Sequence, residues 1–225
     1  MPTRASTPAE KPSASTEYIP RTDSLASLQL AAGACKGCDL YQRGTHVVFG
    51  EGPRSARLML VGEQPGDQED RAGKPFIGPA GRLLDRVLAQ VGLDRGEVYV
   101  TNTVKHFKWE ARGTRRLHVK PSASEVQACR GWLLAELAAI KPTMIVCLGA
   151  VAARSLLGRT FSVTRSRGLV IGDTAWAPWL MATYHPSALL RMPDEAAREA
   201  ALAHFTDDLR RASETLAGLK ASRAS

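Results

Sequence analysis

Residues 57–66, RLMLVGEQPG, run from an apolar segment directly into a polar turn bounded by two glycines. Three more apolar runs follow, at 98–100, 144–148 and 180–183, and two of them also end in polar residues, Thr101-Asn102 and Tyr184-His-Pro-Ser187. Segments with helical spacing separate the runs. Strands that alternate with helices predict a parallel sheet covered on both faces. We therefore expect a three-layer α/β/α sandwich with a central, mostly parallel sheet of four strands.

The expected helices carry recognisable ends. Apolar residues recur at helical spacing through 79–91, and Gly92 follows as a stop signal. Ser122 and Glu125 form a capping box that opens a helix reaching Ile140. Three further helices are expected, at 24–30, 150–157 and 194–216.

Length and composition predict one folded domain, at 24–218, between two tails. Residues 1–23 are rich in Pro, Ser, Thr and Ala and lack apolar periodicity, so we expect a disordered tail there, and a flexible tail at 219–225. No apolar run approaches the ~20 residues that a membrane span needs, and no signal-peptide pattern opens the chain. We expect a cytoplasmic monomer that has no membrane partner.

Most of the net charge lies in one segment. The chain carries a formal charge of +8, and residues 105–120 hold six Lys or Arg against one Glu. Clustered cations mark a binding site for a polyanion such as nucleic acid. The segment also follows an apolar run, and open α/β sheets bind ligands at the carboxyl ends of their strands. A plain solvated loop is the alternative that composition leaves open.

The polar strand ends should share one edge of the sheet, because carboxyl ends of parallel strands lie together. Asn102 offers a carbonyl and an amide that suit a base edge. Phe76 offers a stacking surface, and His185 a donor for a developing oxyanion. Each residue alone has a structural reading, as a strand-end cap, a core ring or a structural histidine. Together they predict a cleft.

Four cysteines accompany this cleft: Cys35, Cys38, Cys129 and Cys147. The first two have CxxC spacing, which lets both thiolates point at one centre. By themselves Cys129 and Cys147 are typical of buried structural cysteine. Spacing alone leaves an iron–sulfur cluster, zinc and no metal open.

The motifs together resemble a known family. GEQPG at 62–66, GKPFIGPAG at 73–81, TNTVKHFKW at 101–109 and the late HPS at 185–187, with the four cysteines, look like the iron–sulfur uracil-DNA glycosylases over residues 30–210. The usual pattern there is GEAPG with a shorter loop after the TN motif. Gln64 and the extended loop ending in Arg115-Arg-Leu-His118 instead resemble the UdgX branch, whose loop reads KRRIH.

This resemblance implies roles for individual residues. The cysteines would hold a [4Fe–4S] cluster. The uracil-binding set would be Gly62, Phe76, Asn102 and Asp67, and the DNA-backbone set Arg115, Arg116 and Ser187. The catalytic set would be His118 as nucleophile at C1′, Glu63 beneath the sugar, His185 on the uracil O2, and Gln64.

The implied reaction begins with uracil flipped from the duplex or taken from a single strand, which we expect to be preferred. His185 suits the departing uracil anion and Glu63 the sugar cation. Capture of the cation by neutral His118 would leave DNA covalently attached, with free uracil as product. Two alternatives remain: a conventional multi-turnover glycosylase that releases abasic DNA, and a non-catalytic uracil-DNA binding module.

Overall fold

A computed structural model describes residues 13–224, with side chains through residue 219. Five strands form the central sheet in the order β2-β1-β5-β7-β6, where all neighbours are parallel except β6 and β7. Their bounds are β1 Leu58–Gly62, β2 Val98–Asn102, β5 Met144–Leu148, β6 Ile171–Gly172 and β7 Trp179–Thr183. The expected four parallel strands are confirmed, and the two-residue β6 adds an antiparallel edge strand.

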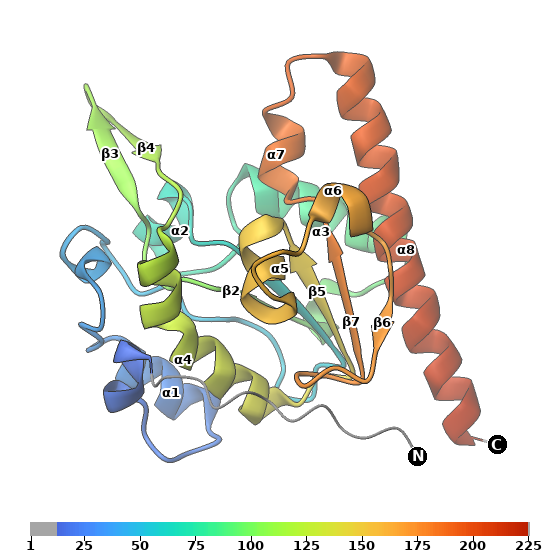
Figure 1. Cartoon of the computed structure of the whole chain (residues 1–225), viewed down its shortest axis with the longest axis horizontal. Coiled ribbons are helices and arrows are strands. Elements are labelled where there is room, and N and C mark those ends of the chain that lie inside the picture. Colours follow the sequence, from blue (N-terminus) through green and yellow to red (C-terminus); the bar gives the residue numbers. More distant parts are fainter. Residues whose placement is uncertain (1–12, 225) are drawn as a thin grey trace.

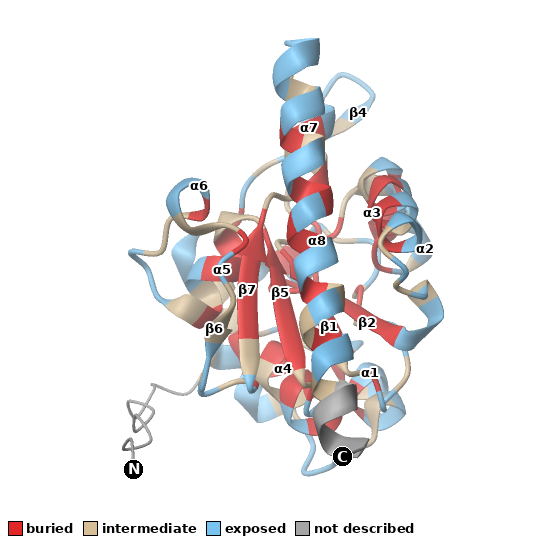
Figure 2. Cartoon of the chain, turned by 90° about the vertical axis from the view of Figure 1, so that its right-hand side faces the viewer, coloured by how far each residue is buried: buried red, intermediate tan, exposed pale blue. Residues whose placement is uncertain are grey.

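Two helical layers cover the sheet. On one face α3 (Pro79–Gln90), α7 (Pro186–Leu190) and α8 (Glu195–Ala224) pack against the strands, and Figure 2 shows α8 lying across that face. On the other face lie α4 (Ala123–Ile140) and α5 (Ala150–Leu157). The smaller helices are α1 Leu25–Ala32, α2 Asp67–Ala72, α6 Val163–Ser166 and the 3₁₀ turns η1 Ala14–Tyr18, η2 Asp39–Gln42 and η3 Arg95–Glu97.

Alternation along the strands divides the core. In β1, Leu58 and Leu60 belong to the cluster beneath α8, whereas Met59 and Val61 belong to the cluster beneath α4. All five residues of β1 are buried. A strand whose two faces are both covered must be apolar at every position, which is why these runs are continuous rather than alternating. The three-layer prediction is confirmed.

Helix ends follow their sequence signals. The Ser122 side chain accepts the Glu125 backbone N–H, and the Glu125 side chain accepts the Ser122 backbone N–H, so the capping box that opens α4 is confirmed. In the part of the chain from 13 to 224, no helix is long and apolar enough to cross a lipid bilayer.

The predicted tails need correction. Residues 14–18 form η1, which packs on α4, and Ser15 is fully buried. The Ser13 hydroxyl accepts the Gly131 backbone N–H at 3.0 Å. Disorder through residue 23 is therefore wrong for these residues, because polar side chains can dock by hydrogen bonds without apolar periodicity; residues 1–12 and 225 lie outside the described residues. Helix α8 also continues past the expected boundary at 218, through Ala224.

Candidate active site

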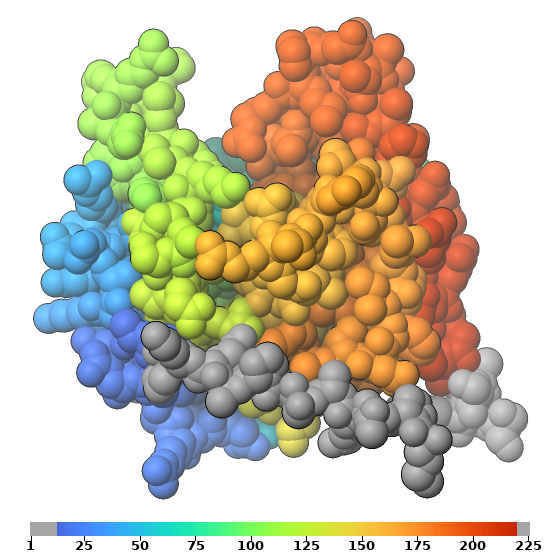
Figure 3. Space-filling view, viewed as in Figure 1, coloured from blue at the N-terminus to red at the C-terminus, as the bar shows by residue number. Residues whose placement is uncertain are grey.

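The polar strand ends meet in one cleft. The residue pairing places Gly62 beside Asn102, and β7 ends at the same edge, just before Tyr184-His185. The cleft has a volume of about 680 Å³, and its lining includes Glu63, Phe76, Asn102, His118 and His185. In Figure 3 it lies between the projecting segment around residues 109–118 and the segment that carries α7. The predicted convergence of the strand ends is confirmed.

Asn102 and Phe76 share the floor of the cleft. Gly62 permits this, because a Cβ there would stand 2.4 Å from Asn102 Oδ1 and 2.7 Å from the Phe76 ring. Asn102 is 2% exposed, and its Oδ1 is buried without a hydrogen-bond partner among the described residues. A buried acceptor left unsatisfied costs about 1–3 kcal/mol, so the site favours a ligand that brings an N–H.

Phe76 is held in an unusual backbone conformation. Its φ is +56°, a region that costs a non-glycine residue about 1–3 kcal/mol. Gly81 allows it, since a Cβ there would lie 1.7 Å from the Phe76 carbonyl oxygen. The buried Glu69 carboxylate accepts the Gly78 N–H at 2.7 Å and fixes the same turn. The ring stacks beside His185 with centroids 6.2 Å apart.

The tautomer of His185 follows from its neighbours. The Ser187 backbone N–H donates to His185 Nδ1 at 3.2 Å, and the Ser187 hydroxyl lies 2.8 Å from the same nitrogen. Burial, with Arg191 and His118 nearby, lowers the pKa of His185 to about 4. The ring is therefore neutral near pH 7. Since Nδ1 accepts, Nε2 carries the hydrogen and can donate it within the cleft.

His118 reaches the cleft from a projecting hairpin. Its Nε2 lies 3.6 Å from Glu63 Oε1, and the two side chains are 37% and 21% exposed. Burial, with a contribution from Arg191, lowers the pKa of His118, so the ring is neutral near pH 7. Burial raises the pKa of Glu63, against the opposing charges of Lys120 and Arg191. A neutral imidazole beside a carboxylate is the arrangement of an activated nucleophile.

The segment after Asn102 is not an open loop. It forms the antiparallel hairpin of β3 (Trp109–Arg112) and β4 (Arg115–His118), which Figure 1 shows projecting from the body. The Gln64 side chain joins both ends of this hairpin: it donates to the carbonyl oxygens of Lys108 (3.3 Å) and Val119 (3.0 Å) and accepts the Lys108 N–H at 3.0 Å. Gln64 thus sets where His118 stands.

Internal ion pairs neutralise half of the predicted basic cluster. Lys105 is buried and pairs with Glu136 at 2.5 Å, and Lys108 pairs with Glu125 at 2.9 Å. Arg116, with a side chain 13% exposed, pairs with Asp67 and Asp70. The remaining three cations of the segment are exposed: Arg112, Arg115 and Lys120. The local charge facing solvent is therefore smaller than composition indicates.

These pairs also place the other expected residues. Asp67 lines the cleft, but its carboxylate is held by Arg71 and Arg116. Ser187 lines the cleft and contacts His185, and Arg191 donates to its hydroxyl at 3.3 Å. Gly62 lies under the cleft. Arg115 is exposed near the hairpin tip, outside the cleft lining.

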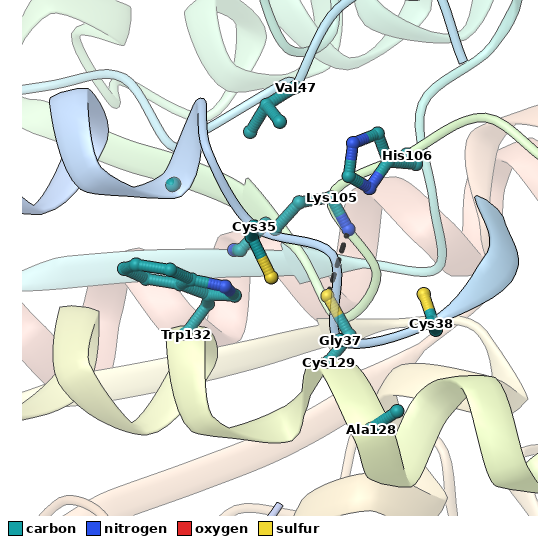
Figure 4. A pocket seen from close by; sticks show the side chains of 10 residues that line it. Cys35, Gly37, Cys38, Val47, Lys105, His106, Ala128, Cys129 and Trp132 are labelled. Carbon is teal, nitrogen blue, oxygen red and sulfur yellow. Dashed lines mark hydrogen bonds between the residues drawn. The ribbon is translucent and has the colours of Figure 1, made fainter. Parts of the chain in front are cut away.

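The four cysteines do not assemble as expected. Cys35, Cys38 and Cys129 line one small cavity with His106, and Figure 4 shows their sulfur atoms directed toward the same space. Cys147 instead lies in β5, fully buried in the core cluster under α4 and α5. The set brought together is three thiols and an imidazole. Sequence reasoning missed His106, although it directly follows the TN motif's lysine.

The donors around this cavity stand apart. Among residues 13–224, no three His, Cys, Asp or Glu side chains converge closely enough for a single metal ion. In a four-iron cluster each ligand binds a different iron, so ligands surround the cluster rather than one point. Burial raises the pKa of Cys38 and raises that of Cys129 to about 12. Three soft sulfur donors and an imidazole suit an iron–sulfur group.

The sequence was compared with protein families and with known proteins. The sequence model of the family described as the uracil DNA glycosylase superfamily matches residues 49–210. A protein named type-4 uracil-DNA glycosylase from Archaeoglobus fulgidus is 39% identical over 166 residues, which cover 71% of this chain and 80% of that protein. Its namesake from Thermotoga maritima is 40% identical over 158 residues, covering 70% and 78%.

A more distant relative is named type-5 uracil-DNA glycosylase, from Pyrobaculum aerophilum. It is 33% identical over 156 residues, which cover 61% of this chain and 64% of that protein. The family match spans β1 to the middle of α8, and so includes the elements that build the sheet and the cleft. The chain belongs to the uracil-DNA glycosylase superfamily.

Proposed function

We propose that this protein excises uracil from DNA and that His118 then forms a covalent bond to C1′ of the sugar. The observation that carries the proposal is the placement of His118 Nε2 3.6 Å from Glu63 Oε1 in the cleft that also holds Phe76, Asn102 and His185. The relatives named uracil-DNA glycosylases support the excision step. The hairpin that resembles the UdgX branch motivates the covalent step.

Recognition of the base would rest on Asn102 and Phe76. The unsatisfied Asn102 Oδ1 suits the N3–H of uracil, and its amide suits O4. Cytosine carries no hydrogen on N3, so it would leave the buried Asn102 Oδ1 unpaired. Its C4 amino group is a donor and would face the Asn102 amide N–H, which is also a donor. The Phe76 ring supplies a stacking face for the pyrimidine.

Bond breaking places a negative charge on uracil and a positive charge on the sugar. The electron pair of the glycosidic bond leaves with uracil, and the His185 Nε2–H donates to its O2. The Glu63 carboxylate stabilises the cation at C1′. One ring nitrogen of His118 then donates its lone pair to C1′, and the proton on the other nitrogen passes to Glu63. An imidazole bonded to carbon is a poor leaving group, so DNA stays attached.

The cysteine cavity would hold the [4Fe–4S] cluster through Cys35, Cys38, Cys129 and His106. Bound there, the cluster would supply a cross-link among three segments: the CxxC turn, the start of the hairpin segment and α4. No electron transfer enters the excision chemistry described above. Cys147 is left out of the proposed ligand set because its thiol lies in another core cluster.

A denaturing gel tests the covalent step. Incubation with a uracil-containing single strand should give a protein–DNA band that survives denaturation, together with one equivalent of free uracil. His118→Ser should abolish the band while uracil release continues, since His185, Asn102 and Phe76 remain. A band that persists in His118→Ser would refute the assigned nucleophile.

A conventional glycosylase is the second candidate. The His118 side chain is 37% exposed, so water can reach the same region of the cleft. Turnover separates the two functions: substoichiometric protein that clears excess uracil-DNA without forming a stable band would establish multi-turnover hydrolysis. A single-stranded and a matched double-stranded substrate in the same assay test the expected single-strand preference.

A further inference from the structure

Lys105 lies in the interior of the protein, where it lines the cysteine cavity. It is 1% exposed, and its ammonium donates to three oxygens: Glu136 Oε2 at 2.5 Å, Thr101 Oγ1 at 2.6 Å and the Asn102 main-chain oxygen at 2.8 Å. An ammonium group has three hydrogens, and these three bonds use all of them. Its charge and its hydrogen bonds are thus committed inside the protein.

The partners of Lys105 form a closed network. Glu136 is fully buried, and its carboxylate also accepts the Gly50 N–H at 3.0 Å, the Tyr99 hydroxyl at 3.0 Å and the Thr101 hydroxyl at 2.9 Å. Every group in this network has a partner. A fully satisfied buried network holds its members rigidly and specifies one geometry.

Helix α4 anchors the lysine at both ends. Cys129 and Glu136 are seven residues apart, which places them on one face of the helix. The Lys105 backbone N–H donates to Cys129 Sγ at 3.3 Å, drawn as the dashed line in Figure 4, while the ammonium reaches Glu136. The backbone and the tip of Lys105 are therefore both tied to α4.

We propose that Lys105 is a positioning residue for base recognition, which holds the main chain of Asn102 so that its side-chain amide meets the uracil edge. This inference rests on the proposed function. The Asn102 Oδ1 has no hydrogen-bond partner among the described residues, so the direction of the amide depends on the main chain that carries it. That main chain is held by the pairing of β2 with β1 and, at its carbonyl oxygen, by the Lys105 ammonium.

Stability alone does not account for such a pair. Replacement of a buried ion pair by apolar residues of similar volume is often neutral or stabilising, because two charges must be desolvated. An apolar pair, however, could not hold a carbonyl oxygen. Apolar residues in place of Lys105 and Glu136 would therefore lose the hydrogen bond from the ammonium to the Asn102 carbonyl oxygen.

The test separates charge balance from positioning. The double variant Lys105→Met/Glu136→Gln removes both charges together, and Leu133→Ala, a buried substitution on the same helix, serves as a control for lost stability. Binding is measured with single strands that contain 2′-fluoro-2′-deoxyuridine, which resists excision, or the matching cytidine. Melting temperature and iron content are recorded for each protein.

The double variant should lose at least tenfold in preference for the uracil strand over the cytidine strand, while its affinity for a strand without uracil stays unchanged. Leu133→Ala should keep the preference for the uracil strand, even if its melting temperature is equal to or below that of the double variant. A double variant that prefers uracil as strongly as the unsubstituted protein would overturn the proposal, and so would an equal loss in Leu133→Ala.

A milder variant covers the case in which the double variant does not fold. Thr101→Val conserves volume and removes one partner of both Lys105 and Glu136, so the preference should fall by about threefold; an unchanged preference would then overturn the proposal. If the unsubstituted protein shows no preference for uracil, the proposed function fails. If the unsubstituted protein prefers the uracil strand and the variants show the same preference, only the role proposed for Lys105 fails.

Discussion

Gln64→Ala should uncouple the covalent step from excision. The Gln64 side chain makes three hydrogen bonds to the base of the β3–β4 hairpin, to the Lys108 oxygen, the Lys108 N–H and the Val119 oxygen. Alanine removes all three and also restores the GEAPG pattern that the wider family resemblance predicts. Asn102 and Phe76, the residues proposed to contact the base, make no hydrogen bond to Gln64 among the described residues.

The magnitude follows from the number of bonds. Each protein hydrogen bond contributes about 1 kcal/mol net, so the hairpin position is weakened by about 3 kcal/mol. At about 1.4 kcal/mol per factor of ten, the population with His118 beside Glu63 falls by up to about 100-fold. The rate of adduct formation should decrease by that factor, and the rate of uracil release by no more than a few-fold.

The assay is a single-turnover time course with protein in excess, in which adduct and free uracil are quantified from the same samples. Gln127→Ala is the matched control, since Gln127 is an exposed residue of α4 whose side chain makes no hydrogen bond to the hairpin among the described residues. An equal decrease in both rates for Gln64→Ala would show that Gln64 does not act on the covalent step alone, and an unchanged adduct rate would show that it does not position His118.

Four further outcomes are expected. Arg116→Met removes the ion pairs between the hairpin and α2, so adduct formation should slow by at least tenfold in the same time course while uracil release persists; parallel losses would contradict this. Adduct formation needs neutral His118, whose pKa lies below its usual 6.5, so the rate should fall at acid pH with a midpoint below 6.5; a midpoint above pH 6.5 would exclude this origin. Burial also lowers the pKa of His185 to about 4, so protonation favours the unfolded chain and the melting temperature should decrease progressively from pH 6.5 toward 4; the decrease should be smaller in His185→Asn, and an equal decrease would contradict this. Cys147→Ser should keep about four irons per chain, whereas His106→Ala should lose iron and visible absorbance; the reverse pattern would restore the four-cysteine set.

Sequence patterns were sufficient where local physics decides the outcome. Three local patterns in the sequence are found in the structure as expected. They are the continuous apolar run of β1, the capping box of α4 and the polar strand ends at Gly62, Asn102 and His185. Because parallel strands put their carboxyl ends at one edge, the position of the cleft also followed from the order of elements.

The tertiary structure alone decided which groups are paired. Lys105 and Arg116 look like DNA-facing cations in the sequence, yet their partners Glu136, Asp67 and Asp70 come from distant segments that only folding brings near. Folding also decides that His106 lies beside three of the cysteines, whereas Cys147 lies in a different part of the core. Residue types and spacing determine which chemistry is available, whereas burial and long-range contacts determine which side chains are left to perform it.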